Sequence, residues 1–167
     1  IMTAYNALNG VPCTANEFLL KDILRKEWKF PGWVVTDCGA IYDIHINHKY
    51  VDDPVEAAAI SLKAGTDLNC GSYFRLYLKE AYERGLVTMN DIDQALIRLF
   101  ASRVKLGVFD PPELNPYSKI PRDVVDSKSH QELALEIARQ SVVLLKNQQN
   151  MLPLKKSVES VAVIGPN

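Results

Sequence analysis

The sequence is poor in the features that mark several large classes of protein. Its 167 residues contain three cysteines and no Cys-x-x-Cys pair, which argues against a zinc module or a disulfide scaffold. No apolar run approaches the roughly 20 residues that a membrane span requires. The 19 basic and 20 acidic residues nearly cancel, so no electrostatic preference for nucleic acid or an anionic membrane is evident. We therefore expect neither nucleic acid nor a membrane as a partner.

Short apolar segments that resemble strands alternate with amphipathic segments that resemble helices. Strands are predicted at residues 1–5, 33–36 and 66–69, and helices at 17–27, 54–64, 73–84 and 89–106. Asn16 stands in position to cap the first helix, while Pro54 and Gly65 are placed to open and close the second. This alternation predicts an α/β fold with a parallel sheet. Three strands cannot bury themselves and both ends look cut, so we expect the remainder of a parent polypeptide to supply their neighbours.

The composition and periodicity of the sequence change after residue 108. Residues 109–127 are rich in proline and lack periodicity, which is typical of a linker between domains. A long amphipathic helix is predicted at 129–146, and the closing "SVAVIGPN" reads as an apolar strand leading into a turn. Without a G-x-G-x-x-G motif, that turn carries no signal for phosphate binding. We expect residues 128–167 to begin a second domain.

Two of the three cysteines share a local setting. Cys38 lies in "TDCG" and Cys70 in "LNCG", each at the end of a predicted strand. If these strands are parallel neighbours, their separation of about 4.8 Å is close to the Cα separation of a disulfide. The sequence is compatible with a Cys38–Cys70 bridge or with two reduced, half-buried thiols.

Polar side chains cluster where the predicted strands end. Tyr5 ends the first strand, Asp37 the second, and Asp67 and Asn69 lie in the third. In parallel sheets and barrels this edge faces the active site, so a phenol from Tyr5 is expected to donate to the carboxylate of Asp37 and hold its pKa low. A carboxylate here can serve as a nucleophile or simply cap a turn. For Asp67 we expect pairing with local backbone amides.

The ordered motifs "MTAYNALNGVPCTAN", "LLKDILRKEWKFPGWVVTDCGAI", "AGTDLNCG", "LALEIARQSVVLLKN", "LPL" and "VAVIGPN" together resemble glycoside hydrolase family 3. The resemblance covers essentially the whole chain and points to the branch of β-xylosidases and related β-glycosidases. It implies a barrel domain of (β/α)8 type, whose C-terminal part is residues 1–108, joined by the linker 109–127 to the first helix and strand of an α/β sandwich at 128–167.

The same resemblance assigns roles to individual residues. Asp37 matches the catalytic nucleophile, which forms a covalent glycosyl-enzyme in a retaining hydrolysis, and Tyr5 matches the tyrosine beside it. Cys38 stands where the β-glucosidase branch often has tryptophan, so it would line the substrate pocket. The acid/base carboxylate would lie downstream of Asn167, and the chain alone is therefore expected to be inactive.

The implied function is exo-acting hydrolysis of β-linked terminal sugars from oligosaccharides or aryl glycosides, without a cofactor, in a periplasmic or extracellular setting. A β-glucosidase, an α-arabinofuranosidase and a non-catalytic carbohydrate-binding relative stay open as alternatives. The acidic and imidazole side chains of Asp43, His45 and His48 lie close together in the sequence, but we expect an exposed loop there and no metal.

Overall fold

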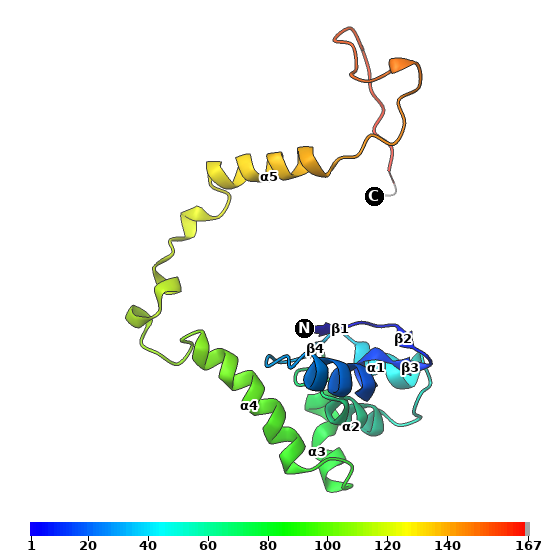
Figure 1. Ribbon diagram of the computed structural model, residues 1–167, viewed down its shortest axis with the longest axis vertical. Coiled ribbons are helices and arrows are strands. Elements are labelled where there is room, and N and C mark those ends of the chain that lie inside the picture. Colours follow the sequence, from blue (N-terminus) through cyan, green and yellow to red (C-terminus); the bar gives the residue numbers. More distant parts are fainter. Residues whose placement is uncertain (166–167) are drawn as a thin grey trace. The chain divides into compact units, whose positions relative to one another are not determined.

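The computed structural model describes residues 1–165, which divide into two compact units. The first unit is Ile1–Pro116 and the second begins at Tyr117. The first unit is α/β, with short parallel strands beside a group of helices (Figure 1). It contains all of the candidate site residues named above.

The parallel strands of the first unit are shorter than predicted. β1 (Met2–Thr3) pairs with β4 (Val35–Thr36), with Met2 opposite Val35. A single parallel bridge joins Val35 to Leu68, so β4 lies between β1 and the third predicted strand. Because all three segments run in the same direction, the residues that follow them lie at one edge of the sheet. This arrangement brings segments that are more than 30 residues apart in the sequence side by side.

A short hairpin lies between the first strand and the first helix, where no regular element was predicted. β2 (Ala7–Leu8) pairs antiparallel with β3 (Val11–Pro12) across Asn9 and Gly10. Both turn residues have positive φ, +51° and +82°, which an Asn-Gly pair adopts at little cost. The dipeptide Asn9-Gly10 is therefore a sequence signal for a hairpin, which we did not predict.

The helices agree largely with the prediction. After the 3₁₀ turn η1 (Cys13–Ala15) comes η2 (Phe18–Glu27), a helix of π type, and the Asn16 side chain accepts a hydrogen bond from the Leu19 amide. The next predicted helices are α2 (Pro54–Ala64), α3 (Tyr73–Glu83) and α4 (Met89–Lys105). Gly65 closes α2 with φ +116°, and Thr88 opens α4 with a capping box. The helix α1 (Ala40–Ile46) lies where we expected an exposed loop.

The core of the first unit is built around α2. Seven of its eleven residues are buried, including four alanines whose small side chains allow neighbouring helices to approach closely. One side of α2 packs on α3 and α4, and another contacts Ile41 and Ile44 of α1, both fully buried. The apolar residues of α1 are thus anchored in the core, which explains why this segment is a helix and not the exposed loop that we expected.

A buried carboxylate, that of Asp67, joins two helices to the sheet at the amino-terminal end of the strands. Asp67 lies at the start of the third extended segment, and its side chain has no exposed surface. It accepts hydrogen bonds from the Val34 amide at 2.8 Å, from Arg25 of η2 at 3.0 Å and from Arg98 of α4 at 2.7 Å. We expected local backbone amides as partners, but the amide that binds Asp67 is that of Val34, 33 positions away on the neighbouring strand segment. The two arginines were not predicted. Desolvation lowers the pKa of Arg25, an effect that the charge of Asp67 opposes.

The second unit has no buried residue between positions 117 and 165. Its main helix, α5 (Lys128–Ser141), is shorter than predicted because the β-branched Val142 and Val143 follow in extended, unpacked chain. We predicted that an apolar strand leads into a turn within residues 160–167. The strand is absent from residues 160–165, and residues 166–167 lie outside the described residues. The remaining 3₁₀ turns are η3 (Pro112–Leu114), η4 (Pro116–Lys119), η5 (Arg122–Val124) and η6 (Gln148–Asn150).

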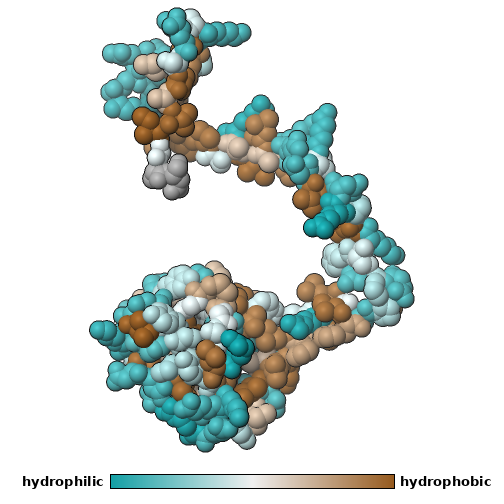
Figure 2. All heavy atoms as spheres, turned by 180° about the vertical axis from the view of Figure 1, so that it is seen from behind, coloured by the Kyte–Doolittle hydropathy of each residue, from teal (hydrophilic) through white to brown (hydrophobic). Residues whose placement is uncertain are grey.

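Large apolar side chains are exposed on both units, and Figure 2 shows them scattered over the surface. On α5 they include Leu133, Leu135 and Ile137. Within residues 1–165, no helix combines the length and the apolar character that crossing a bilayer would take.

We predict that Asp67→Asn destabilises the first unit by about 3 kcal/mol or more, because it leaves two partly buried arginines without their counter-charge. Urea unfolding of the full-length protein, followed by a probe in this unit, measures the effect. Asp22→Asn is the matched control, since it breaks only the exposed pair with Lys26 and should change stability little. Equal midpoints for the two variants would contradict the structural role given to Asp67.

Candidate active site

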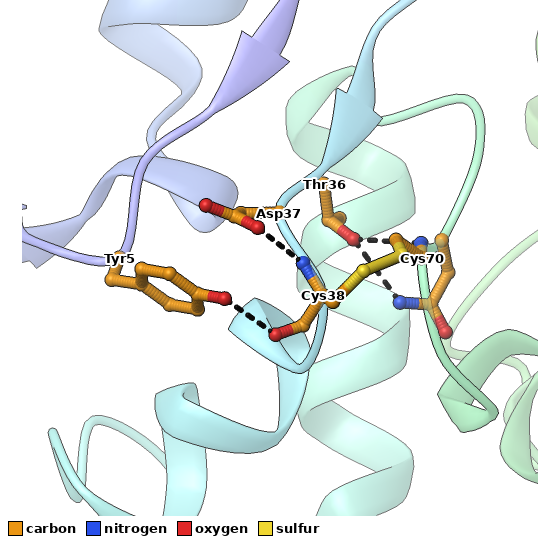
Figure 3. Close-up of a disulfide and its surroundings, with 6 residues drawn as sticks. Tyr5, Thr36, Asp37, Cys38 and Cys70 are labelled. Carbon is orange, nitrogen blue, oxygen red and sulfur yellow. Dashed lines mark hydrogen bonds between the residues drawn. A yellow bond between two sulfur atoms is a disulfide. The ribbon is translucent and has the colours of Figure 1, made fainter. Parts of the chain in front are cut away.

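Asp37 ends the central strand and begins the turn into α1. Its amide donates to the Thr3 carbonyl at 3.2 Å, and its own carbonyl accepts from the Ala40 amide at 3.1 Å. The turn passes through Gly39, whose φ of +85° favours glycine. One carboxylate oxygen, Oδ1, accepts a hydrogen bond from the Cys38 amide at 2.7 Å (Figure 3). Asp37 therefore does cap a local turn, but with one oxygen only.

The charge of Asp37 is not neutralised by a neighbouring cation. Among residues 1–165, no lysine, arginine or histidine forms an ion pair with this carboxylate, and its side chain is partly exposed. This contrasts with Asp67, whose two oxygens are both occupied by arginines. A carboxylate held at one oxygen and unpaired in charge retains the capacity to attack an electrophile.

Tyr5 lies beside Asp37, as its position after β1 predicted, but its hydrogen bond goes elsewhere. The hydroxyl donates to the carbonyl of Cys38 at 2.7 Å, where we expected the carboxylate as acceptor (Figure 3). The pKa of the phenol is raised, first by desolvation and then by the nearby negative charges of Asp37 and Asp43. Because a raised pKa favours the neutral phenol, Tyr5 stays a donor through neutral and mildly alkaline pH.

Cys38 is joined to Cys70 by a disulfide that links the ends of the second and third extended segments. Thr36 supports this link, because its hydroxyl accepts from the Cys70 amide at 2.9 Å and from Asn69 Nδ2 at 3.2 Å. The Gly39 amide also donates to the Cys70 carbonyl at 3.0 Å. The loop that carries Asp37 is thus tied to the neighbouring loop by covalent and hydrogen bonds. Cys13 is a free cysteine.

The acidic and imidazole groups that follow Asp37 do not converge. Asp43 accepts from the side chain of Asn47, His45 Nδ1 lies 3.3 Å from the Tyr73 hydroxyl, and His48 Nε2 lies 2.7 Å from the Tyr5 carbonyl oxygen. Within the part of the chain that the structure describes, no three histidine, cysteine or acidic side chains are grouped as a metal would require. The contact of His48 with Tyr5 was missed, since no local pattern connects residues so far apart.

Residues 1–101 match the family model described as the glycosyl hydrolase family 3 N-terminal domain. A probable exo-1,4-β-xylosidase of Aspergillus clavatus is 51% identical over 99% of this chain and 22% of its own. A probable β-D-xylosidase of Arabidopsis thaliana is 46% identical over 100% of this chain and 22% of its own.

Solved structures give a similar result. A family 3 exo-β-xylosidase in complex with a xylobiose aziridine activity-based probe superposes with a TM-score of 0.81 at 41% identity, over 95% of this chain and 21% of that one. A β-glucosidase of Listeria innocua in complex with glucose has a TM-score of 0.77 at 32% identity, over 92% and 21%. The chain therefore spans about a fifth of the length of these relatives.

We predict that non-reducing peptide mapping recovers the Cys38 and Cys70 peptides as one linked species, with Cys13 open to alkylation. Cys70→Ser should lower the free energy of unfolding by about 3–4 kcal/mol, because it releases a loop closed over a sequence separation of 32 residues. Cys13→Ser is the control and should leave the link intact. Alkylation of Cys38 and Cys70 in protein that was never reduced would contradict the bridge.

Proposed function

The chain belongs to glycosyl hydrolase family 3, and from this premise we propose that its parent protein is a retaining, exo-acting β-glycosidase of the β-xylosidase type. It releases terminal non-reducing sugars from oligosaccharides. The observation that carries the proposal is the carboxylate of Asp37, which lies at the carboxyl end of the central strand and forms no ion pair with any residue of 1–165. The curated relatives at about half identity are named β-xylosidases, which supports the choice of sugar.

In the first chemical step an Asp37 oxygen attacks the anomeric carbon while the bond to the leaving-group oxygen breaks. A second carboxylic acid, outside this chain, donates the proton that the leaving group takes. Water then attacks the same carbon and gives a proton to the second carboxylate, which regenerates the acid. The glycosyl ester bond breaks in the same step, which releases the sugar and returns Asp37 as a free carboxylate. Two carboxyl groups about 5–5.5 Å apart are needed for this geometry.

Tyr5 contributes by holding the peptide that follows the nucleophile. Its hydroxyl fixes the Cys38 carbonyl, and the amide of the same residue fixes Oδ1 of Asp37. The phenol therefore orients the carboxylate through the backbone of Cys38. Its oxygen is also close to the carboxylate, where lone pairs stabilise the positive charge that develops near the sugar ring oxygen.

We assign the chain to three parts of the parent. Residues 1–108 form the C-terminal part of a (β/α)8-type barrel, 109–127 a linker, and 128–167 the start of an α/β sandwich domain. The parallel order of the first unit supports the barrel, since each strand is followed by helix and the candidate residues share the carboxyl edge. The exposed apolar face of α5 fits a helix that packs on further chain.

The disulfide shapes the sugar-binding wall. Cys38 is exposed beside Asp37 and bonded to Cys70. Where the β-glucosidase branch often has a large tryptophan side chain, this chain therefore presents a compact disulfide. We therefore expect a pocket shaped differently from that of a β-glucosidase, and the names of the relatives favour xylose as the sugar. A β-glucosidase is the second candidate, supported by the likeness to the Listeria innocua structure.

We predict that Asp37→Gly in the full-length protein lowers kcat for an aryl β-xyloside by about three or more powers of ten. Sodium azide should restore turnover and yield the α-glycosyl azide, because the anion enters the space of the lost carboxylate. Asp43→Asn is the control, on the neighbouring helix, and should retain activity without an azide effect. Near-normal turnover of the glycine variant in the absence of azide would remove the nucleophile assignment.

We also predict a ranking of substrates by the intact enzyme. Aryl β-D-xyloside should give the highest kcat/KM, with aryl β-D-glucoside and aryl α-L-arabinofuranoside at least about tenfold lower. Comparison of nitrophenyl glycosides under one set of conditions measures this. A preference for glucoside would replace the xylosidase assignment with the β-glucosidase one, and turnover of none would support a non-catalytic relative.

A further inference from the structure

We propose that His48 is a positioning residue. It donates a hydrogen bond from Nε2 to the Tyr5 carbonyl and so fixes Tyr5 beside the turn that carries Asp37. The contact is 2.7 Å long and joins residues 43 positions apart. The inference rests on the proposed function, because Tyr5 acts by orienting Asp37, the proposed nucleophile.

Two hydrogen bonds hold Tyr5 at opposite ends of the residue. Its hydroxyl is bound to the Cys38 carbonyl and its main-chain carbonyl to His48, each at 2.7 Å. Both anchors come from the segment that follows β4, which also carries Asp37. Tyr5 is 46% exposed, so packing within this unit does not by itself fix its place. The pair of hydrogen bonds therefore defines the position of the phenol relative to the carboxylate.

His48 is itself held by a rigid element. Its amide donates to the Asp43 carbonyl at 2.8 Å, directly beyond the end of α1. The Tyr50 amide, two residues on, donates to the carbonyl of Ile44, a fully buried residue of the same helix. The turn that carries the imidazole is thus bound to a helix whose apolar face lies in the core. Through its hydrogen bond, His48 fixes the exposed chain around Tyr5 to this turn.

The chemistry of the contact determines which nitrogen acts. A carbonyl oxygen only accepts hydrogen bonds, so Nε2 of His48 must carry a proton. Either the neutral Nε2–H tautomer or the imidazolium satisfies this requirement. A glutamine amide places an N–H donor near the position of Nε2, whereas an asparagine amide is shorter and places it near Nδ1. These two substitutions therefore separate the proposed contact from a general need for a polar residue.

The test uses the full-length protein with an aryl β-xyloside. His48→Ala and His48→Asn should lower kcat about five- to tenfold, as expected for the loss of one hydrogen bond, with KM little changed. His48→Gln should restore most of kcat. His45→Asn is the matched control on α1, because His45 contacts Tyr73 and not Tyr5, and it should leave kcat unchanged.

A double variant isolates the route of the effect. In a Tyr5→Ala background the carbonyl remains but no phenol is left to position, so His48→Ala should cause no further loss of kcat. Additive losses would overturn the proposal. So would equal kcat for His48→Gln and His48→Ala, or wild-type kcat for His48→Ala.

A second measurement does not depend on catalysis. Hydrogen–deuterium exchange of the peptide that contains residues 3–8 should be faster in His48→Ala than in wild type, and close to wild type in His48→Gln. Unchanged exchange in His48→Ala would overturn the positioning role even if the protein hydrolyses xylosides. If exchange is faster in His48→Ala but the wild-type protein hydrolyses no glycoside, the proposed function is refuted, while the positioning of Tyr5 by His48 is supported.

Discussion

The hydrogen bonds of the Cys38 backbone are the constraint on which the candidate site depends. Its amide holds Oδ1 of Asp37, its carbonyl receives the Tyr5 hydroxyl, and its side chain is bonded to Cys70. One residue thus connects the nucleophile candidate, its aromatic neighbour and the adjacent strand end. Any change that lets this residue move alters the direction of the carboxylate and the place of the phenol together.

The two ends of the strands use carboxylates in opposite ways. At the amino-terminal end Asp67 is buried and paired with Arg25 and Arg98, which ties η2 and α4 to the sheet. At the carboxyl end Asp37 is partly exposed and lacks an ion-pair partner among the described residues. The first arrangement stabilises the fold, and the second preserves the reactivity of the carboxylate. This contrast supports Asp37, rather than Asp67, as the proposed nucleophile.

Much of this organisation could be predicted from the sequence. Short apolar runs alternating with helical patterns indicated the parallel order, and Pro54, Gly65 and Asn16 marked helix ends through local backbone requirements. The shared Cys-Gly settings at two strand ends suggested that Cys38 and Cys70 lie close together. These features depend on neighbours in the sequence or on strand pairing, both of which leave a pattern.

Contacts made through tertiary structure could not be predicted in the same way. The arginines on Asp67 come from η2 and α4, and the imidazole on the Tyr5 carbonyl comes from the turn after α1. No local signal specifies how these elements are oriented. The preference of the Tyr5 hydroxyl for a carbonyl over the carboxylate depends on a turn of the backbone at Gly39. The strand predicted near the end of the sequence is absent from residues 160–165 for a related reason, because a strand forms only when it pairs with another strand.

The central claim is that Asp37 forms a covalent bond with the sugar. The most direct measurement is to incubate the full-length enzyme with an activated 2-deoxy-2-fluoro-β-xyloside, which slows hydrolysis of the intermediate, and to locate the added sugar by mass spectrometry of proteolytic peptides. The account predicts a single 2-fluoroxylosyl ester on the peptide that contains Asp37. Attachment of the sugar to a different carboxylate, with Asp37 unmodified, would contradict it.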